Sequence, residues 1–126
     1  MTDKLILEKV EHTAKIIINN PSANTWDLES LSELEKMIAA LNKDDDIFSL
    51  VITGQGEKFF SAGADLKVFH EGGKEAAKEM SNAFSSAFGA LSKFRGVSIA
   101  AINGFAMGGG LECALACDIR VAEEKA

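Results

Sequence analysis

The fold is decided by one stretch, Asn103-Gly104-Phe105-Ala106-Met107-Gly108-Gly109-Gly110-Leu111-Glu112. An apolar run at residues 97–102 leads into it, and a run of small residues at 113–117 follows it. That order predicts a buried strand, a glycine turn and a helix. Because glycine lacks a Cβ atom, three in succession let a ligand approach the backbone closely. Free N–H groups at the start of a helix favour negative charge, so the stretch predicts N–H donors beside one carboxylate, Glu112.

Short apolar runs elsewhere in the chain predict strands. Residues 5–10 and 14–19 predict a hairpin. Residues 47–53 are apolar nearly throughout, which predicts a strand covered on both faces. Residues 58–60 predict a short extended piece, and residues 118–122 predict a further strand.

Two helical patterns lie between these strands. The first follows the only proline, takes Thr25 or Asp27 as its N-cap, and carries one apolar stripe. The stripe consists of Leu28, Leu31, Leu34, Ile38 and Leu41. The second pattern covers residues 74–95, after a flexible break at residues 70–73, and Gly96 ends it. Because strands alternate with helices, the predicted class is α/β.

Composition narrows the classes of function. The chain has 126 residues, of which 47% are hydrophobic and 25% are charged, as in a soluble domain with one core. Its net charge of −6 and the lack of a basic block argue against nucleic acid, but leave open a local basic pocket for a phosphorylated ligand. No apolar run approaches the roughly 20 residues of a membrane span, and the N-terminus lacks a signal-peptide layout. We therefore expect a cytoplasmic protein with no membrane partner.

Cys113 and Cys117 lie four residues apart on the predicted helix. This spacing argues against a structural disulfide and fits reduced thiols. A metal pair is an alternative, but His12 and His70 lie far away in the sequence, so we expect buried core cysteines and no metal site. The acidic trio at residues 44–46 lacks the glycine and the alternating ligands of a calcium loop, which favours a solvated turn.

A second turn of small residues, Ser61-Ala62-Gly63-Ala64-Asp65, precedes the second helix. Two such turns that aim N–H groups at one carbonyl oxygen form an oxyanion hole, and tight packing of each turn is the alternative. Other glycine-dependent sites are excluded by spacing. The glycines do not follow the Gly-x-Gly-x-x-Gly pattern of a dinucleotide site, no Lys-Ser/Thr follows them as in a phosphate loop, and no Gly-x-Ser-x-Gly elbow is present.

The carboxylates near these turns have two interpretations. The helix dipole alone favours an acidic residue such as Glu112 in a first turn. However, the neighbours Leu111, Cys113 and Ala114 predict that Glu112 is buried. A buried carboxylate needs a partner or a raised pKa, which favours an acid/base role. We interpret Asp65 as a cap for the turn that follows it.

Taken together, the two turns resemble those of the enoyl-CoA hydratase/isomerase (crotonase) family. The resemblance rests on Ser61-Ala62-Gly63-Ala64-Asp65-Leu66 and on Ala101-Ile102-Asn103-Gly104-Phe105-Ala106-Met107-Gly108-Gly109-Gly110-Leu111-Glu112. It runs from the first hairpin to residues 118–122, and both motifs in this order are far more specific than either alone. It implies a spiral of repeated ββα units. It also implies acyl-CoA thioester substrates and no separate cofactor, because coenzyme A is part of the substrate.

The resemblance also implies roles for individual residues. By motif position, Ala64 and Gly109 would donate N–H groups to the thioester carbonyl, and Glu112 falls on the first catalytic glutamate. In the hydratases of fatty acid β-oxidation type, that glutamate and a second one activate water for addition across the α,β double bond. Residues 67–73 and the helix after them match the region that shapes the acyl pocket. The residues implied to contact coenzyme A are Ala62, Ala64, Asp65, Leu66, Lys67 and Gly109.

Two departures from the family pattern affect the expected activity. Val97 stands where a proline is common, and the chain ends before the segment that carries the second glutamate. Glu123 and Glu124 match no catalytic position. The C-terminal helices that complete the pocket and help to form trimers are missing as well. We therefore interpret residues 1–126 as the N-terminal part of a single crotonase-like domain, and we expect this fragment to be inactive alone and its parent protein to be a homotrimer or hexamer.

Three hypotheses follow from the sequence. The first is a lyase that hydrates 2-enoyl-CoA with Glu112 and a downstream glutamate. The second is an isomerase of the same fold, which moves a double bond with the downstream glutamate as base. The third is a non-catalytic truncated module that binds coenzyme A weakly or assembles with other chains.

Overall fold

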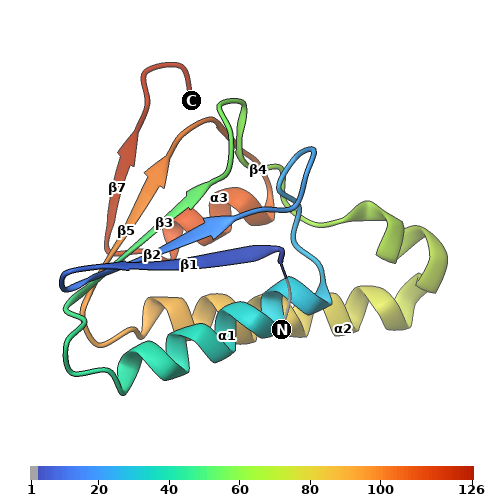
Figure 1. Ribbon diagram of the computed structural model, residues 1–126. Helices are drawn as coiled ribbons and strands as arrows, with labels where there is room; N and C mark the ends of the chain where they lie inside the picture. Colours follow the sequence, from blue (N-terminus) through green and yellow to red (C-terminus); the bar gives the residue numbers. More distant parts are fainter. Residues whose placement is uncertain (1–2) are drawn as a thin grey trace.

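The main sheet of the computed structural model, which describes residues 3–126, has five strands in the order β1-β2-β3-β5-β7. These strands are β1 (Leu5–Val10), β2 (Thr13–Ile18), β3 (Ser49–Gly54), β5 (Val97–Ile102) and β7 (Ile119–Ala122). The predicted hairpin is confirmed, because β1 and β2 pair antiparallel, whereas the other neighbours pair parallel. Both long helices, α1 and α2, lie on the same face of this sheet (Figure 1).

Helix α1 (Leu28–Asn42) begins at a capping box formed by Asp27 and Ser30. The Asp27 carboxylate accepts a hydrogen bond from the Ser30 backbone N–H at 2.9 Å, and the Ser30 hydroxyl accepts one from the Asp27 backbone N–H at 3.0 Å. Asp27, not Thr25, is therefore the N-cap. The Lys4 ammonium lies 2.6 Å from the same carboxylate, which ties the cap to the residue before β1. The predicted apolar stripe faces the core, although Leu28 at its start is only half-buried.

Helix α2 (Leu66–Ser92) contains a first segment, before Gly73, that the sequence did not predict as helical. The expected break at residues 70–73 is confirmed at Gly73, whose φ of 62° and ψ of −145° are not helical, so that two helical segments meet there at a kink. Glycine tolerates this conformation at no steric cost. The helix ends at Ser92 with Lys93 as its C-cap, so the prediction that Gly96 ends it was wrong.

A second, smaller sheet pairs β4 (Phe59–Ser61) with β6 (Phe105–Ala106) in parallel. With α3 (Gly109–Leu115), the element order becomes β1-β2-α1, β3-β4-α2, β5-β6-α3 and then β7. The fold is therefore a succession of three ββα units, as the resemblance implied. Strand β6 was not predicted from the sequence.

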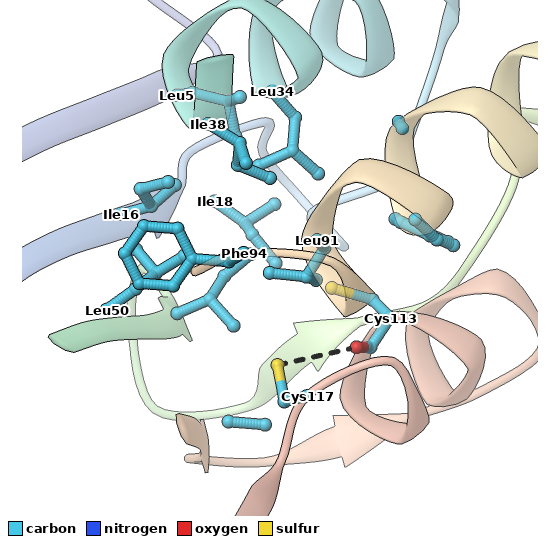
Figure 2. Close-up of a cluster of buried hydrophobic side chains, with 14 of the residues drawn as sticks. Leu5, Ile16, Ile18, Leu34, Ile38, Leu50, Leu91, Phe94, Cys113 and Cys117 are labelled. Carbon is cyan, nitrogen blue, oxygen red and sulfur yellow. Dashed lines mark hydrogen bonds between the residues drawn. The ribbon is translucent and has the colours of Figure 1, made fainter. Parts of the chain in front are cut away.

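The core lies between the main sheet and the helices (Figure 2). Ile16 and Ile18 of β2 and Leu50 of β3 contribute buried side chains to it, as do Leu34 and Ile38 of α1. The prediction that β3 is covered on both faces holds only in part, because its alternate residues, such as Val51, are half-buried. Within residues 3–126, no helix is long and apolar enough to cross a membrane.

Candidate active site

The two turns that the sequence singled out lie in direct contact. Each follows a strand of the small sheet and precedes a helix, and the parallel pairing of β4 with β6 brings them to the same edge. The Met107 N–H donates to the Ser61 carbonyl at 3.0 Å. A Cβ atom added to Gly63 would lie 2.8 Å from the Met107 carbonyl oxygen and 3.1 Å from the Gly109 nitrogen. Close approach of the two backbones therefore requires glycine at position 63.

Three backbone N–H groups of these turns have no acceptor in the described part of the chain: that of Gly108, which is exposed to solvent, and those of Ala64 and Gly109. Within residues 3–126, neither the Ala64 N–H nor the Gly109 N–H donates a hydrogen bond. The residue that follows each of the last two is satisfied: the Asp65 N–H donates to the Trp26 carbonyl at 2.9 Å and the Gly110 N–H donates to the Met107 carbonyl at 2.8 Å. An N–H group without an acceptor costs free energy when it is buried, so those of Ala64 and Gly109 suit an external acceptor.

The Ala64 and Gly109 N–H groups each follow a glycine in the left-handed region. Gly63 precedes Ala64 with φ of +102°, and Gly108 precedes Gly109 with φ of +53°. Residues with a side chain rarely adopt this conformation. In both strand-to-helix turns, a glycine in the left-handed region therefore precedes the acceptor-free amide.

Both residues line one cleft of about 600 Å³ between α2 and α3. Ala64 and Gly109 lie on its wall, and so does Glu112. The rest of its wall consists of Ala77, Ser81, Phe84, Ser85, Phe88, Gly89, Ser92 and Ala116. Three of the sequence-predicted site residues, two with acceptor-free N–H groups and one with a carboxylate, therefore line one cleft.

Glu112 is exposed, so the prediction that it is buried was wrong. Helix α3 has only two turns, and it directs Gly110, Cys113 and Ala114 to the core while Glu112 lies at the cleft. Leu111, whose apolar side chain suggested burial, is itself 45% exposed. The carboxylate is thus open to the cleft and to water.

Comparison with known proteins places the chain in a family. Residues 8–126 match the family model described as enoyl-CoA hydratase/isomerase. The chain belongs to the enoyl-CoA hydratase/isomerase family. Among curated relatives, the crotonyl-CoA hydratase of Syntrophomonas wolfei is 38% identical over 125 residues, which are 98% of this chain and 48% of the relative. The short-chain-enoyl-CoA hydratase of Clostridium acetobutylicum is 36% identical over the same shares.

Solved structures show the same likeness. The structure of Pseudomonas aeruginosa DspI superposes with a TM-score of 0.97 and 66% identity, over 99% of this chain and 51% of that one. An enoyl-CoA hydratase from Bacillus anthracis superposes with a TM-score of 0.95 and 34% identity, over 98% and 49%. The chain therefore spans about half the length of the family members it matches.

Of the residues predicted to contact coenzyme A, all but Gly109 lie around the start of α2. Asp65 is the N-cap of this helix, and its carboxylate accepts a hydrogen bond from the Lys67 N–H at 3.1 Å, which confirms the predicted cap. Ala62 is half-buried and donates to the Ala23 carbonyl at 2.9 Å. Leu66 is 74% exposed, and Lys67 is exposed as well. Of the predicted contacts, only Ala64 and Gly109 line the cleft itself.

Two asparagines to which the sequence analysis assigned no role support the turn between β3 and β4. The Asn103 side-chain amide donates to the carbonyls of Gly54 at 2.9 Å and Gly56 at 2.8 Å. The Asn24 side-chain amide donates to the carbonyls of Gln55 at 3.1 Å and Phe59 at 3.0 Å. Both lie in loops, where polar residues are ordinary, so the sequence carries no signal for these bonds.

The two cysteines are free and buried, as predicted. Burial raises the pKa of the Cys117 thiol to about 11 and raises that of Cys113 well above its usual value. Neither thiol is therefore a nucleophile at neutral pH. Among the described residues, no group of three or more histidine, cysteine or acidic side chains could hold a metal ion.

Proposed function

We propose that the complete protein adds water across the double bond of 2-enoyl-CoA thioesters. One observation carries the proposal: the acceptor-free N–H groups of Ala64 and Gly109 lie on one cleft together with Glu112. The substrate class is supported by relatives named crotonyl-CoA hydratase and short-chain-enoyl-CoA hydratase. Coenzyme A would lie along Ala62 to Lys67 at the start of α2, and it would enter as part of the substrate.

The chemistry requires stabilisation of a developing enolate. As the water oxygen bonds to C3 of the enoyl group, electron density moves onto the thioester oxygen. The Ala64 and Gly109 N–H groups would stabilise that charge, and loss of one such donor costs about 10²–10³ in kcat. Glu112 would serve as one of the two carboxylates that exchange protons with the water and with C2, the second being the further glutamate that the resemblance implies.

Replacement of Glu112 by Gln in the complete protein tests this proposal. Glutamine keeps the size of the side chain but exchanges no proton, so hydration of crotonyl-CoA should slow by about 10²–10⁴-fold. Glu79→Gln is the matched control, because Glu79 is exposed on α2 and does not line the cleft. Full activity of Glu112→Gln would refute the assignment.

Isomerisation of 3-enoyl-CoA is the second candidate. It is supported by the family model, whose description covers both activities, and by a 41% identical Bacillus subtilis relative named as a putative enoyl-CoA hydratase/isomerase. The same oxyanion hole would stabilise the dienolate formed when a base removes a proton from C2. Chromatographic analysis of products from a 3-enoyl-CoA separates the two reactions.

The third hypothesis concerns residues 1–126 alone. We expect this piece to bind coenzyme A weakly and to be catalytically inactive, and calorimetric titration with coenzyme A tests the binding.

We also propose that the complete protein is a homotrimer or hexamer, as the resemblance implies, and light scattering measures its oligomeric state.

A further inference from the structure

The backbone of Trp26 fixes the turn that holds Ala64. Trp26 and Ala64 form an isolated parallel β-bridge. The Trp26 N–H donates to the Gly63 carbonyl at 2.7 Å, and the Trp26 carbonyl accepts from the Asp65 N–H at 2.9 Å. Gly63 and Asp65, on either side of Ala64, thus both form hydrogen bonds with the Trp26 backbone, while the Ala64 N–H has no acceptor.

The Trp26 side chain continues into a row of aromatic rings. It is fully buried, and its ring meets that of Phe88 edge-on, with centroids 5.5 Å apart. Phe88 in turn contacts Phe84 with a centroid distance of 5.3 Å. Both distances lie within the roughly 4.5–7 Å over which aromatic pairs attract each other. The row therefore crosses from the Ala64 turn to the face of α2 that lines the cleft.

At its Phe84 end, the row of rings packs against Gly109, the second predicted N–H donor. A Cβ atom added to Gly109 would lie 2.7 Å from Cε1 and 2.9 Å from Cζ of Phe84. The Phe84 ring therefore packs directly on the Gly109 backbone, next to its acceptor-free amide. Phe84 and Phe88 also line the cleft, so the row forms part of its wall.

We propose that Trp26, Phe88 and Phe84 are positioning residues that hold the amide of Ala64 and the amide of Gly109 at the separation needed for one carbonyl oxygen. The inference rests on the proposed oxyanion hole. Hydrogen bonds from two amides to one atom depend steeply on distance and angle. A shift of about 1 Å in a group placed by packing can cost about 10²-fold in rate. The row supplies a packed connection between two turns that belong to different ββα units.

The test compares leucine substitutions in the complete protein. Phe84→Leu removes the ring that lies on Gly109, and Phe94→Leu is the matched control, because Phe94 is buried but neither lines the cleft nor contacts these rings. The probe is butyryl-CoA labelled with ¹³C at the carbonyl, which binds like a substrate but has no double bond to hydrate. Its infrared C=O stretch reports polarisation by the two amides.

We expect wild-type protein to lower the C=O stretch on binding, and Phe84→Leu to lose at least half of that shift. Phe84→Leu should also lower kcat for crotonyl-CoA by about 10–100-fold while KM changes less than about threefold. Phe94→Leu should lower thermal stability but retain the shift and kcat. If Phe84→Leu does not fold, Phe88→Leu provides the same comparison one contact further along the row. A full shift and wild-type kcat in a folded Phe84→Leu or Phe88→Leu variant would overturn the proposal.

A double-mutant cycle tests the contact itself. Gly109→Ala should abolish the shift in the wild-type background, because the new methyl group meets the Phe84 ring. In the Phe84→Leu background, Gly109→Ala should reduce the C=O shift by less. Additive effects of the two substitutions on the shift would argue against coupling between Phe84 and Gly109. The proposed function has a separate outcome. If wild-type protein polarises butyryl-CoA but does not hydrate crotonyl-CoA, the hydratase proposal fails and the positioning test still stands, whereas absence of any wild-type shift overturns the positioning role.

Discussion

Gly63 shows how much of the site depends on one missing side chain. Its carbonyl accepts from Trp26, its φ is +102°, and its Cα faces the second turn. An added methyl group would approach the Met107 carbonyl oxygen to 2.8 Å and the Gly109 nitrogen to 3.1 Å. The position therefore carries two separate constraints, one on backbone conformation and one on space.

Gly63→Ala should separate these two constraints when it is compared with Gly56→Ala. Gly56 has a similar φ of +91°, but nothing lies within 4 Å of a Cβ atom there. Gly56→Ala should cost only the conformational term, about 1–2 kcal/mol. Gly63→Ala should cost a further 1–3 kcal/mol or so by overpacking, and should lower kcat/KM at least about tenfold by moving the amides. Urea unfolding and crotonyl-CoA hydration measure both effects, and equal behaviour of the variants would contradict the spatial constraint.

At the scale of elements, hydrophobic periodicity predicted the hairpin, helix α1 and strand β3 close to their observed bounds. Strand β6 escaped prediction because two residues show no periodicity, and its pairing with β4 is a tertiary contact. Helix α2 is interrupted at Gly73 as predicted, but its first segment, from Leu66, was missed because so short a segment shows little periodicity. The exposure of Glu112 was missed because a two-turn helix has few residues on each face, and apolar neighbours do not establish which face is covered.

At the site too, local features were predictable from the sequence and long-range contacts were not. Local glycine chemistry identified both turns, but their mutual contact and the row from Trp26 to Phe84 join residues far apart in the sequence. Individual roles for Ala64 and Gly109 came from the resemblance rather than from spacing. They remain predictions that the acceptor-free amides support.

The cap of α1 makes a prediction about pH. Burial alone would raise the pKa of the Asp27 carboxyl, but hydrogen bonds from Lys4 and Ser30 outweigh it and hold the pKa below its usual value of 3.8. Asn is also a good N-cap, so Asp27→Asn removes the charge and keeps the cap. The variant should be about 1 kcal/mol less stable than wild type at neutral pH. This difference should persist above the unfolded pKa of about 3.9 and vanish as pH falls through the lowered folded pKa.

The matched control is Asp65→Asn, because Asp65 caps α2 without an ion pair in the described part of the chain. The difference in free energy of unfolding between Asp65→Asn and wild type should change little over the same range of pH. Thermal unfolding between acidic and neutral pH measures both variants. A pH-independent deficit in Asp27→Asn would show that the Lys4 contact contributes nothing.

At the scale of the whole molecule, the three ββα units meet at the turn between β3 and β4. Asn24 reaches it from the first unit and Asn103 from the third, and between them they bind four carbonyls of the second unit. The Asn103 side-chain oxygen Oδ1 also accepts from the Gly54 N–H at 3.0 Å. The chain leaves this turn through β4 directly into the Gly63 turn. The polar junction therefore sets where one of the two predicted donors lies.

Asn103→Asp tests this junction, because the substitution keeps the shape and replaces the donating NH₂ group by an oxygen. That oxygen would face the carbonyls of Gly54, Gly56 and Phe59, so three hydrogen bonds become repulsions, and the free energy of unfolding should fall by about 3 kcal/mol. Crotonyl-CoA hydration should fall too, since the Gly63 turn loses its support. Asn82→Asp is the control, because Asn82 is exposed on α2 and makes no side-chain hydrogen bond within residues 3–126. Equal urea midpoints for the two variants would mean that the junction does not hold the units together.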